Sequence, residues 1–231
     1  MQLTSKGIVL QYFKYSESSA IVKILTEKEG LYSCFAKKIS GKKSKTPISL
    51  LQPLSLIIIS SKEQSSKSLP ILSEINLAHP LTPISVEKTF VLMFVSEVLL
   101  KVLRPGEKDN PLFNYIWDLH VFLRNKNKLN KYFSLFFLIK LSELLGFGPN
   151  KAPGEYFDME TAEFVKEKPA HNNIIEGDET IIFRMLLDKN VQEINLVYRT
   201  SILNHLLNFY KIHGHELKGL NTHVVINSLR K

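Results

Sequence analysis

The chain has 231 residues, of which 44% are hydrophobic and 23% are charged, and these are the proportions of an ordinary globular protein. Its 30 Lys and Arg residues outnumber its 22 Asp and Glu residues, which leaves a net charge of +8. One cysteine excludes a disulfide framework and a multi-cysteine metal site. No apolar run reaches the roughly 18 to 20 residues of a membrane span, and the first residues do not resemble a signal peptide. We therefore expect a cytoplasmic protein without a membrane partner.

The excess positive charge lies in the N-terminal third of the chain. Residues 1–75 contain eleven lysines and five glutamates, which gives +6 of the total +8. A basic balance favours an anionic partner, such as nucleic acid, an anionic membrane surface or an acidic protein segment, without choosing among them. The uneven distribution indicates that the N-terminal part binds the anion.

The first 80 residues predict five short β-strands. Residues 8–15, 20–26 and 31–38 are rich in β-formers and are separated by short turn-like segments, which predicts an antiparallel meander. Two further strands are predicted at residues 54–59 and 69–77. Five short strands in this length predict a small closed barrel, of which the OB-fold is the best-known nucleic-acid-binding form. We place the domain boundary at the proline-containing segment that follows, so that residues 1–80 form the barrel domain.

Five lysines occur at the end of the third predicted strand and in the segment that follows it. They are Lys37, Lys38, Lys42, Lys43 and Lys45. The segment is too polar and too self-repelling to pack, so we expect an exposed loop that stays mobile until an anion orders it. A solvated basic turn would have the same composition. If about four of these lysines contact phosphates, affinity for single-stranded DNA should fall with salt at a log–log slope of roughly −3.

Aromatic residues near these lysines predict base stacking. Alternation along the first strand places Tyr12 on one face and Phe13 and Tyr15 on the other, and a bulge would reverse the phase. About half of the aromatic residues of this region should belong to the core. The candidate nucleic-acid residues on the strands are Tyr12, Lys14, Lys23 and Tyr32.

From residue 86 onward the hydrophobic period changes from two to about 3.6, which predicts helices. They cover residues 86–103, 111–124, 131–145, 178–188, 195–212 and 221–230. An irregular insertion at about 151–177 contains a predicted hairpin, 156–158 with 163–165, and a loop-like segment, 169–177. The sequence therefore predicts an α+β protein, with a five-stranded OB-fold barrel followed by a helical bundle domain, residues 81–231, that carries a small insertion.

The sequence contains no recognisable catalytic constellation. It has no phosphate-binding glycine loop and no nucleophile elbow, and Cys34 alternates with its neighbours as a barrel residue would. The histidines near the C-terminus are His205, His213, His215 and His223. The run His213-Gly214-His215 is more typical of a helix end than of a metal site. We predict a protein that is not an enzyme, with no catalytic residue, metal, cofactor or small-molecule substrate.

Several stretches together resemble one family. The N-terminal run GIVLQYFKYSESSAIVKILTEKEGLYSCFAK, the strand LLQPLSLIII, the helix end LSELLGFGPN and the C-terminal YKIHGHELKGLNTHVVINSL are similar to bacterial RecO, a recombination mediator and strand-annealing protein. The resemblance implies an OB-fold, a helical bundle, and binding of single- and double-stranded DNA in the nucleoid. It also implies that the protein engages the acidic C-terminal tail of the single-strand-binding protein SSB, partners RecR and helps to load RecA.

Many relatives of this kind carry a four-cysteine zinc site in the insertion after the GFGPN-type helix end. Here residues 151–177 contain no cysteine, so we predict that this chain has no structural zinc. We expect apolar contacts of Tyr156, Phe157 and Phe164 to hold the insertion.

The helical part offers a candidate groove for the SSB tail. An apolar side chain of the tail would fill the groove while its carboxylates pair with cations at the rim. The candidate residues are Lys131, Phe137, Lys140, Leu141 and Arg199, and ordinary surface charge explains the three cations equally well. One alternative for the whole protein is an OB-fold RNA-binding or ribosome-associated protein, because the barrel chemistry suits RNA as well. A weaker alternative is a structural adaptor that binds acidic proteins.

Overall fold

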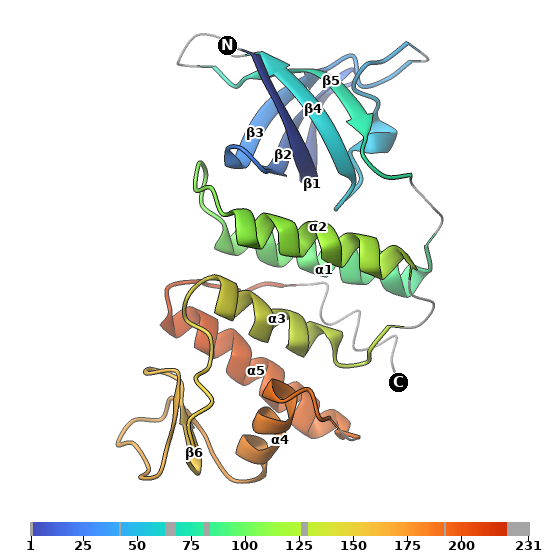
Figure 1. The fold of residues 1–231 in the computed structure, drawn as a ribbon. Helices are drawn as coiled ribbons and strands as arrows, with labels where there is room; N and C mark the ends of the chain where they lie inside the picture. The colour runs from blue at the N-terminus through green and yellow to red at the C-terminus, as the bar shows by residue number, and fades with distance from the viewer. Residues whose placement is uncertain are drawn as a thin grey trace. The chain divides into compact units, whose positions relative to one another are not determined.

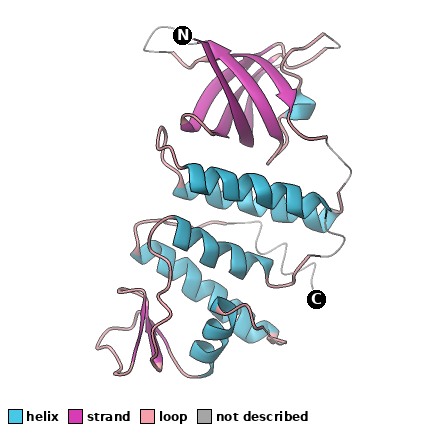
Figure 2. Ribbon diagram, viewed as in Figure 1, coloured by secondary structure: helices cyan, strands magenta, loops and turns pink. Residues whose placement is uncertain are grey.

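The computed structural model describes residues 2–41, 43–62, 68–80, 84–125, 129–191 and 193–220. They form two compact units, one that includes the residues up to 128 and one that spans Leu129–Leu220 (Figure 1). The first unit holds a β-barrel and two long helices, and the second holds helices and a small sheet (Figure 2). No helix within the described ranges is long and apolar enough to cross a membrane.

The barrel is closed by five strands in the order β1-β2-β3-β5-β4. They are β1 (Gln2–Ser16), β2 (Ser19–Thr26), β3 (Gly30–Lys37), β4 (Leu56–Lys62) and β5 (Ile71–Leu77). Neighbouring strands are antiparallel, except that β3 and β5 are parallel. The predicted OB-fold barrel is confirmed. Strand β1 begins at Gln2 instead of residue 8, because its polar first half pairs with β4.

The meander of β1, β2 and β3 has an inner and an outer face. Val9 and Ile24 are cross-strand partners on the inner face and are fully buried in the barrel core. Their neighbours Ile8, Leu25 and Leu31 form a row across the outer face, and these side chains are buried as well. Something outside the barrel must therefore cover this end of the outer face.

Helix α1 (Val86–Val102) covers that end (Figure 1). Ser96 Oγ of α1 donates a hydrogen bond to the carbonyl oxygen of Leu10 on β1. The loop between α1 and α2 (Asn110–Asn125) packs on the β2–β3 turn, where Gly30 has a φ of +61°. A Cβ at Gly30 would lie 1.9 Å from the carbonyl oxygen of Glu107, so only glycine fits. Both helices are thus tied to the barrel.

The predicted boundary at residue 80 follows the last barrel strand, whereas the compact unit continues through both helices. The independence of residues 1–80 as a domain stays a prediction.

The second unit contains α3 (Phe133–Leu144), α4 (Asp178–Leu187) and α5 (Leu196–Ile212). Its sheet has the order β7-β6-β8 and consists of β6 (Tyr156–Asp158), β7 (Glu163–Val165) and β8 (Ile174–Ile175). The predicted hairpin is confirmed. The loop-like prediction for residues 169–177 is wrong at β8, which pairs with β6 because both of its isoleucines are buried. Five predicted helices are confirmed to within about two residues, and the sixth, 221–230, lies outside the described residues.

Aromatic side chains form the core of the insertion. The rings of Phe157 and Phe183 lie 4.8 Å apart, and those of Phe157 and Phe164 lie 5.0 Å apart. All three side chains are buried, while Tyr156 is only partly buried. The insertion therefore packs onto α4 through phenylalanines, as the sequence predicts.

Candidate nucleic-acid interface

The open end of the outer meander face carries two exposed aromatic side chains. Phe13 is 48% exposed and Tyr15 is 71% exposed. Phe13 is the cross-strand partner of Ile21, and Ile21 is the partner of Phe35, so the three form a row across β1, β2 and β3. Tyr15 packs edge-on against Phe35, with 5.5 Å between the ring centroids. Exposed rings of this kind are stacking platforms for bases.

A bulge in β1 determines which side chains reach this face. The register against β2 shifts between Val9 and Gln11, which leaves Leu10 as the additional residue. After the bulge, Gln11 and Lys23 are cross-strand partners on the outer face. Lys23 Nζ lies 5.9 Å from the centroid of the Phe13 ring. A cation and an exposed ring are therefore neighbours on this surface.

The predicted stacking residues Tyr12 and Tyr32 lie on the inner face. Both are partly buried against the barrel core, and the hydroxyl groups of Tyr32 and Ser61 share a hydrogen bond of 2.9 Å. The expectation that these tyrosines are exposed is therefore not met, because the phase of the strands turns other aromatic residues outward. Lys14 is exposed near the end of β1. Contact of these three side chains and of Lys23 with nucleic acid stays a prediction.

The lysine-rich loop, residues 37–45, lies at the same end of the barrel. The N–H group of Ile39 donates to the carbonyl oxygen of Ser18 in the β1–β2 turn, at 3.0 Å. Thr46 Oγ1 donates to the carbonyl oxygen of Lys37 at 2.7 Å and closes the loop at its base. A hollow between loop and turn is lined by Ser18, Lys38, Ser40, Gly41, Lys43 and Ser44. The predicted exposure is confirmed for the described lysines of the loop, and their mobility stays a prediction.

Six lysines around this end have no ion-pair partner among the residues that the structure describes. They are Lys14, Lys23, Lys37, Lys38, Lys43 and Lys45. On the opposite part of β1, by contrast, Lys6 pairs with Glu27 at 3.6 Å. Lys42 lies outside the described residues. Lysines without an ion-pair partner inside the protein can pair with an external anion. Together with the exposed rings, the loop and the strands therefore form one basic, aromatic surface.

The apolar residues of the predicted tail-binding groove lie inside the second unit. Phe137 is 1% exposed and Leu141 is fully buried. Arg199 lies on α5 and is partly buried. Phe137 and Leu141 would therefore support a groove more readily than line it.

The predicted rim cations of this groove already have partners. Lys131 Nζ lies 2.9 Å from Glu193 Oε1, and Lys140 Nζ lies 2.8 Å from Glu143 Oε2. A ligand carboxylate would have to replace one of these glutamates. The tail-binding role of all five residues stays a prediction.

Two of the C-terminal histidines stack on one phenylalanine. The Phe147 ring stacks with those of His213 and His215, with ring centroids 4.9 Å and 5.3 Å away and nearly parallel planes. His213 Nε2 donates to the carbonyl oxygen of Met159, at 2.9 Å. The GFGPN and HGH stretches, which both contribute to the family resemblance, therefore meet in space. His223 lies outside the described residues.

The residues of the insertion do not fit a zinc ion. Residues 151–177 contain no cysteine, and no cluster of three or more potential His, Cys, Asp or Glu ligands occurs in the described ranges. A guanidinium provides a cross-link instead. Arg184 of α4 donates to the carbonyl oxygen of Gly154 at 2.9 Å and lies 3.9 Å from the Phe164 ring centroid. It joins the chain before β6, strand β7 and α4.

Two buried groups of the first unit have strongly shifted pKa values. Burial raises the pKa of the Cys34 thiol to about 12, so the thiol stays protonated in the barrel core, where it was predicted to lie. Burial, together with Arg124 and His79, lowers the pKa of His120 to about 4. Arg124 Nε donates to His120 Nε2 at 2.9 Å, which keeps the imidazole neutral.

These features define a class: OB-fold proteins with exposed aromatic rings and unpaired lysines at one end of the barrel and helices packed on the other. The family described as "Recombination protein O N terminal" matches residues 1–81. A DNA repair protein RecO of Flavobacterium psychrophilum is 30% identical to this chain over 92% of both proteins. The DNA repair protein RecO of Bacteroides fragilis (strain ATCC 25285) is 30% identical to this chain over 90% of both proteins. That of Azobacteroides pseudotrichonymphae is 28% identical over 99% of both proteins.

The chain therefore belongs to the RecO family of DNA repair proteins. Its role lies in DNA repair and recombination, and the names of these relatives state no enzymatic activity.

Proposed function

We propose that this chain is a recombination mediator that binds single-stranded DNA across the outer face of β1, β2 and β3. Bases stack on Phe13 and Tyr15, while Lys23 and the lysine-rich loop contact the phosphates. The observation that carries the proposal is the combination of two exposed rings with six lysines that have no ion-pair partner among the described residues. Stacking tolerates any base, and phosphate contacts carry no sequence information, so binding should not depend on sequence.

Double-stranded DNA would use the lysines alone. Paired bases are already stacked on one another and cannot reach Phe13 or Tyr15 without opening. Duplex binding should therefore be weaker and should depend on salt through phosphate contacts only. A protein that holds two single strands raises the rate at which they meet, and weaker binding of the duplex lets the annealed product leave.

The proposed partners are SSB, RecR and, indirectly, RecA. The acidic tail of SSB would bind at Lys131, Lys140 and Arg199, where its carboxylates replace glutamate partners such as Glu193 and Glu143. Titration of a labelled tail peptide against Lys140→Glu and Arg199→Glu variants tests this site. Unchanged affinity in both variants would remove these residues from it.

The deciding experiment measures annealing of complementary single strands that are coated with SSB. Acceleration by this protein, lost when Phe13 and Tyr15 are both replaced by alanine, supports the mediator function. RNA binding without acceleration of DNA annealing would instead support an RNA-binding protein, since the same surface chemistry suits either nucleic acid.

A further inference from the structure

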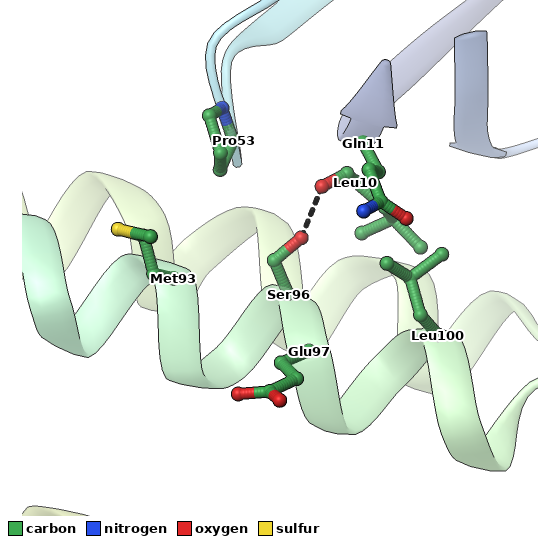
Figure 3. Close-up of a pocket in the computed structure, with 7 residues that line it drawn as sticks. All are labelled: Leu10, Gln11, Pro53, Met93, Ser96, Glu97 and Leu100. Carbon is green, nitrogen blue, oxygen red and sulfur yellow. Dashed lines mark hydrogen bonds between the residues drawn. The ribbon is translucent and has the colours of Figure 1, made fainter. Parts of the chain in front are cut away.

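A groove opens where α1 crosses β1 (Figure 3). It has a volume of about 310 Å³, at the lower end of the range for small-molecule sites. Its lining residues come from β1, the segment before β4 and α1, and they are Leu10, Gln11, Pro53, Met93, Ser96, Glu97 and Leu100. Met93 is 40% exposed at its edge. The groove belongs entirely to the first unit.

The polar groups of the groove differ in their availability. The hydrogen bond from Ser96 Oγ to the Leu10 carbonyl oxygen uses both groups inside the fold. The side-chain amide of Gln11 has no hydrogen-bond partner among the described residues. In Figure 3 this amide extends from β1 toward α1, and the Glu97 carboxylate extends away from it. A guest between the apolar walls would therefore find one free amide, which both donates and accepts.

The charge of the lining distinguishes this groove from the rest of the barrel surface. Its one charged residue is Glu97, and no cation is among the residues that line it. A phosphate or an acidic peptide would therefore find no positive counter-charge in the lining. A flat, uncharged group with donors and acceptors on its edge suits the groove better.

The groove also continues the proposed DNA path. Gln11 and Phe13 are two positions apart on β1 after the bulge, so they share the outer face at a distance of about 7 Å. Tyr15 lies at a second register shift, between Lys14 and Ser16, and packs against Phe35 on the same face. Lys23 is the cross-strand partner of Gln11 and can hold a phosphate beside the groove mouth. A strand that follows Tyr15 and Phe13 along β1 reaches Gln11 next.

We propose that this groove takes a single unstacked nucleobase of the bound strand. The inference rests on the proposed function, because it extends the same DNA path to the edge of α1. The base lies between Met93 and Leu100 on one side and Leu10 and Pro53 on the other, and the Gln11 amide bonds to its edge. An amide pairs with the donor–acceptor edge of any base, so the site accepts all four bases while it fixes the position of the strand.

The chain allows a direct test by disulfide trapping. Cys34 is fully buried and its thiol stays protonated, so a Met93→Cys variant has a single reactive thiol. The probe is a single-stranded oligonucleotide that carries one cytosine with a short thiol tether on N4, activated as a mixed disulfide. The matched control is Met185→Cys on α4, where the native methionine is 36% exposed.

We expect Met93→Cys to form the disulfide at least about tenfold faster than Met185→Cys, because a base in the groove raises the local concentration of the tether. Adding Gln11→Ala to Met93→Cys should lower this rate, and an excess of unmodified oligonucleotide should abolish it. Equal rates of disulfide formation at the two cysteine positions, while anisotropy shows that DNA is still bound, would overturn the inference. The groove would then be a candidate site for an apolar protein segment instead. Failure of the unaltered protein to bind the oligonucleotide in the same anisotropy measurement would instead refute the proposed function.

Discussion

Lysines of the two units differ in what surrounds them. Those of the barrel end have no carboxylate partner in the described chain, whereas four lysines of the second unit are paired, namely Lys131, Lys140, Lys151 and Lys168. The overall charge follows the same division. Residues 1–75 carry +6, and residues 129–220, with ten Lys and Arg against twelve Asp and Glu, carry −2.

Aromatic residues follow the same division. Phe13 and Tyr15 are exposed on the barrel, and Phe157, Phe164 and Phe183 are buried in the second unit. Exposed ion pairs contribute little stability, typically 0 to about 1 kcal/mol, so the pairing in the second unit mainly neutralises its surface. The comparison teaches that the positive field comes from the barrel end and that substitutions in the two units should have separable effects.

Phe157→Ala should have the largest effect and should leave DNA binding intact. Removal of a fully buried phenylalanine costs roughly 3 to 5 kcal/mol. Denaturant unfolding should show this loss, while affinity for single-stranded DNA, measured under native conditions, stays the same. Phe122→Ala is the control, since Phe122 is 51% exposed.

A chelator should not lower the melting temperature of the unaltered protein, and a clear decrease would contradict the absence of structural zinc.

Acid should destabilise the first unit through His120. Its pKa is about 4 in the folded chain and 6.5 ordinarily, so between these pH values the unfolded state binds a proton that the folded state does not. The free energy of unfolding should therefore decrease by about 3 kcal/mol in total as the pH falls from 6.5 to 4. Above pH 6.5, His120 should not contribute to the pH dependence of stability. In His120→Gln, which keeps an acceptor for Arg124, this part of the slope should vanish. An identical pH profile for both proteins would refute the assignment.

Replacing Lys38, Lys43 and Lys45 together by alanine should weaken binding of single-stranded DNA. If each contacts one phosphate, the log–log salt slope should flatten by about 2 and affinity in 0.1 M salt should fall roughly 100-fold. The matched control replaces three paired lysines of the second unit, Lys131, Lys151 and Lys168, which changes the net charge equally. Equal losses in both triple variants would show that net charge, and not the site, governs binding.

Phe13→Ala and Tyr15→Ala should each reduce affinity for single-stranded DNA by about 1 to 3 kcal/mol, with unchanged melting temperature and little effect on duplex binding.

Tyr32→Phe should lower the stability of the protein and leave its DNA affinity unchanged. It removes the hydroxyl that shares a hydrogen bond with Ser61, so it should cost about 1 kcal/mol of stability and no DNA affinity. If Tyr12→Ala or Tyr32→Ala lost DNA affinity without losing stability, the inner tyrosines would be the stacking residues after all.

Much of the fold follows from local sequence patterns. Alternation, turn residues and the change to a helical period locate five strands and five helices, because these signals act over a few residues. The bulge at Leu10 is not visible in this way, since it arises from pairing with β2, and it turns Gln11 and Phe13 to the outer face although Val9 faces the barrel core. Strand β8 is too short for a periodic signal.

The candidate site is only partly predictable for a similar reason. The lysine-rich loop is visible from composition alone. The pairing of Lys131 with Glu193 cannot be predicted from the sequence, because 62 residues separate the two. The sequence pattern around a surface lysine is the same whether or not the lysine has a partner. Which part of the outer meander face is covered depends on α1, about 80 residues further along the chain, so the groove beside Gln11 could not be anticipated from the strands.

The contact of Gly30 with Glu107 limits how the barrel can be exchanged between proteins. A recombination event that joined residues 1–80 to another protein would leave Ile8, Leu10 and Leu25 without the helix that covers them. The transplanted barrel would then present an apolar stripe to solvent and associate with other chains. The smallest unit that can be moved intact includes α1, α2 and the loop that meets Gly30, so the proposed DNA surface and its supporting helices are expected to be inherited together.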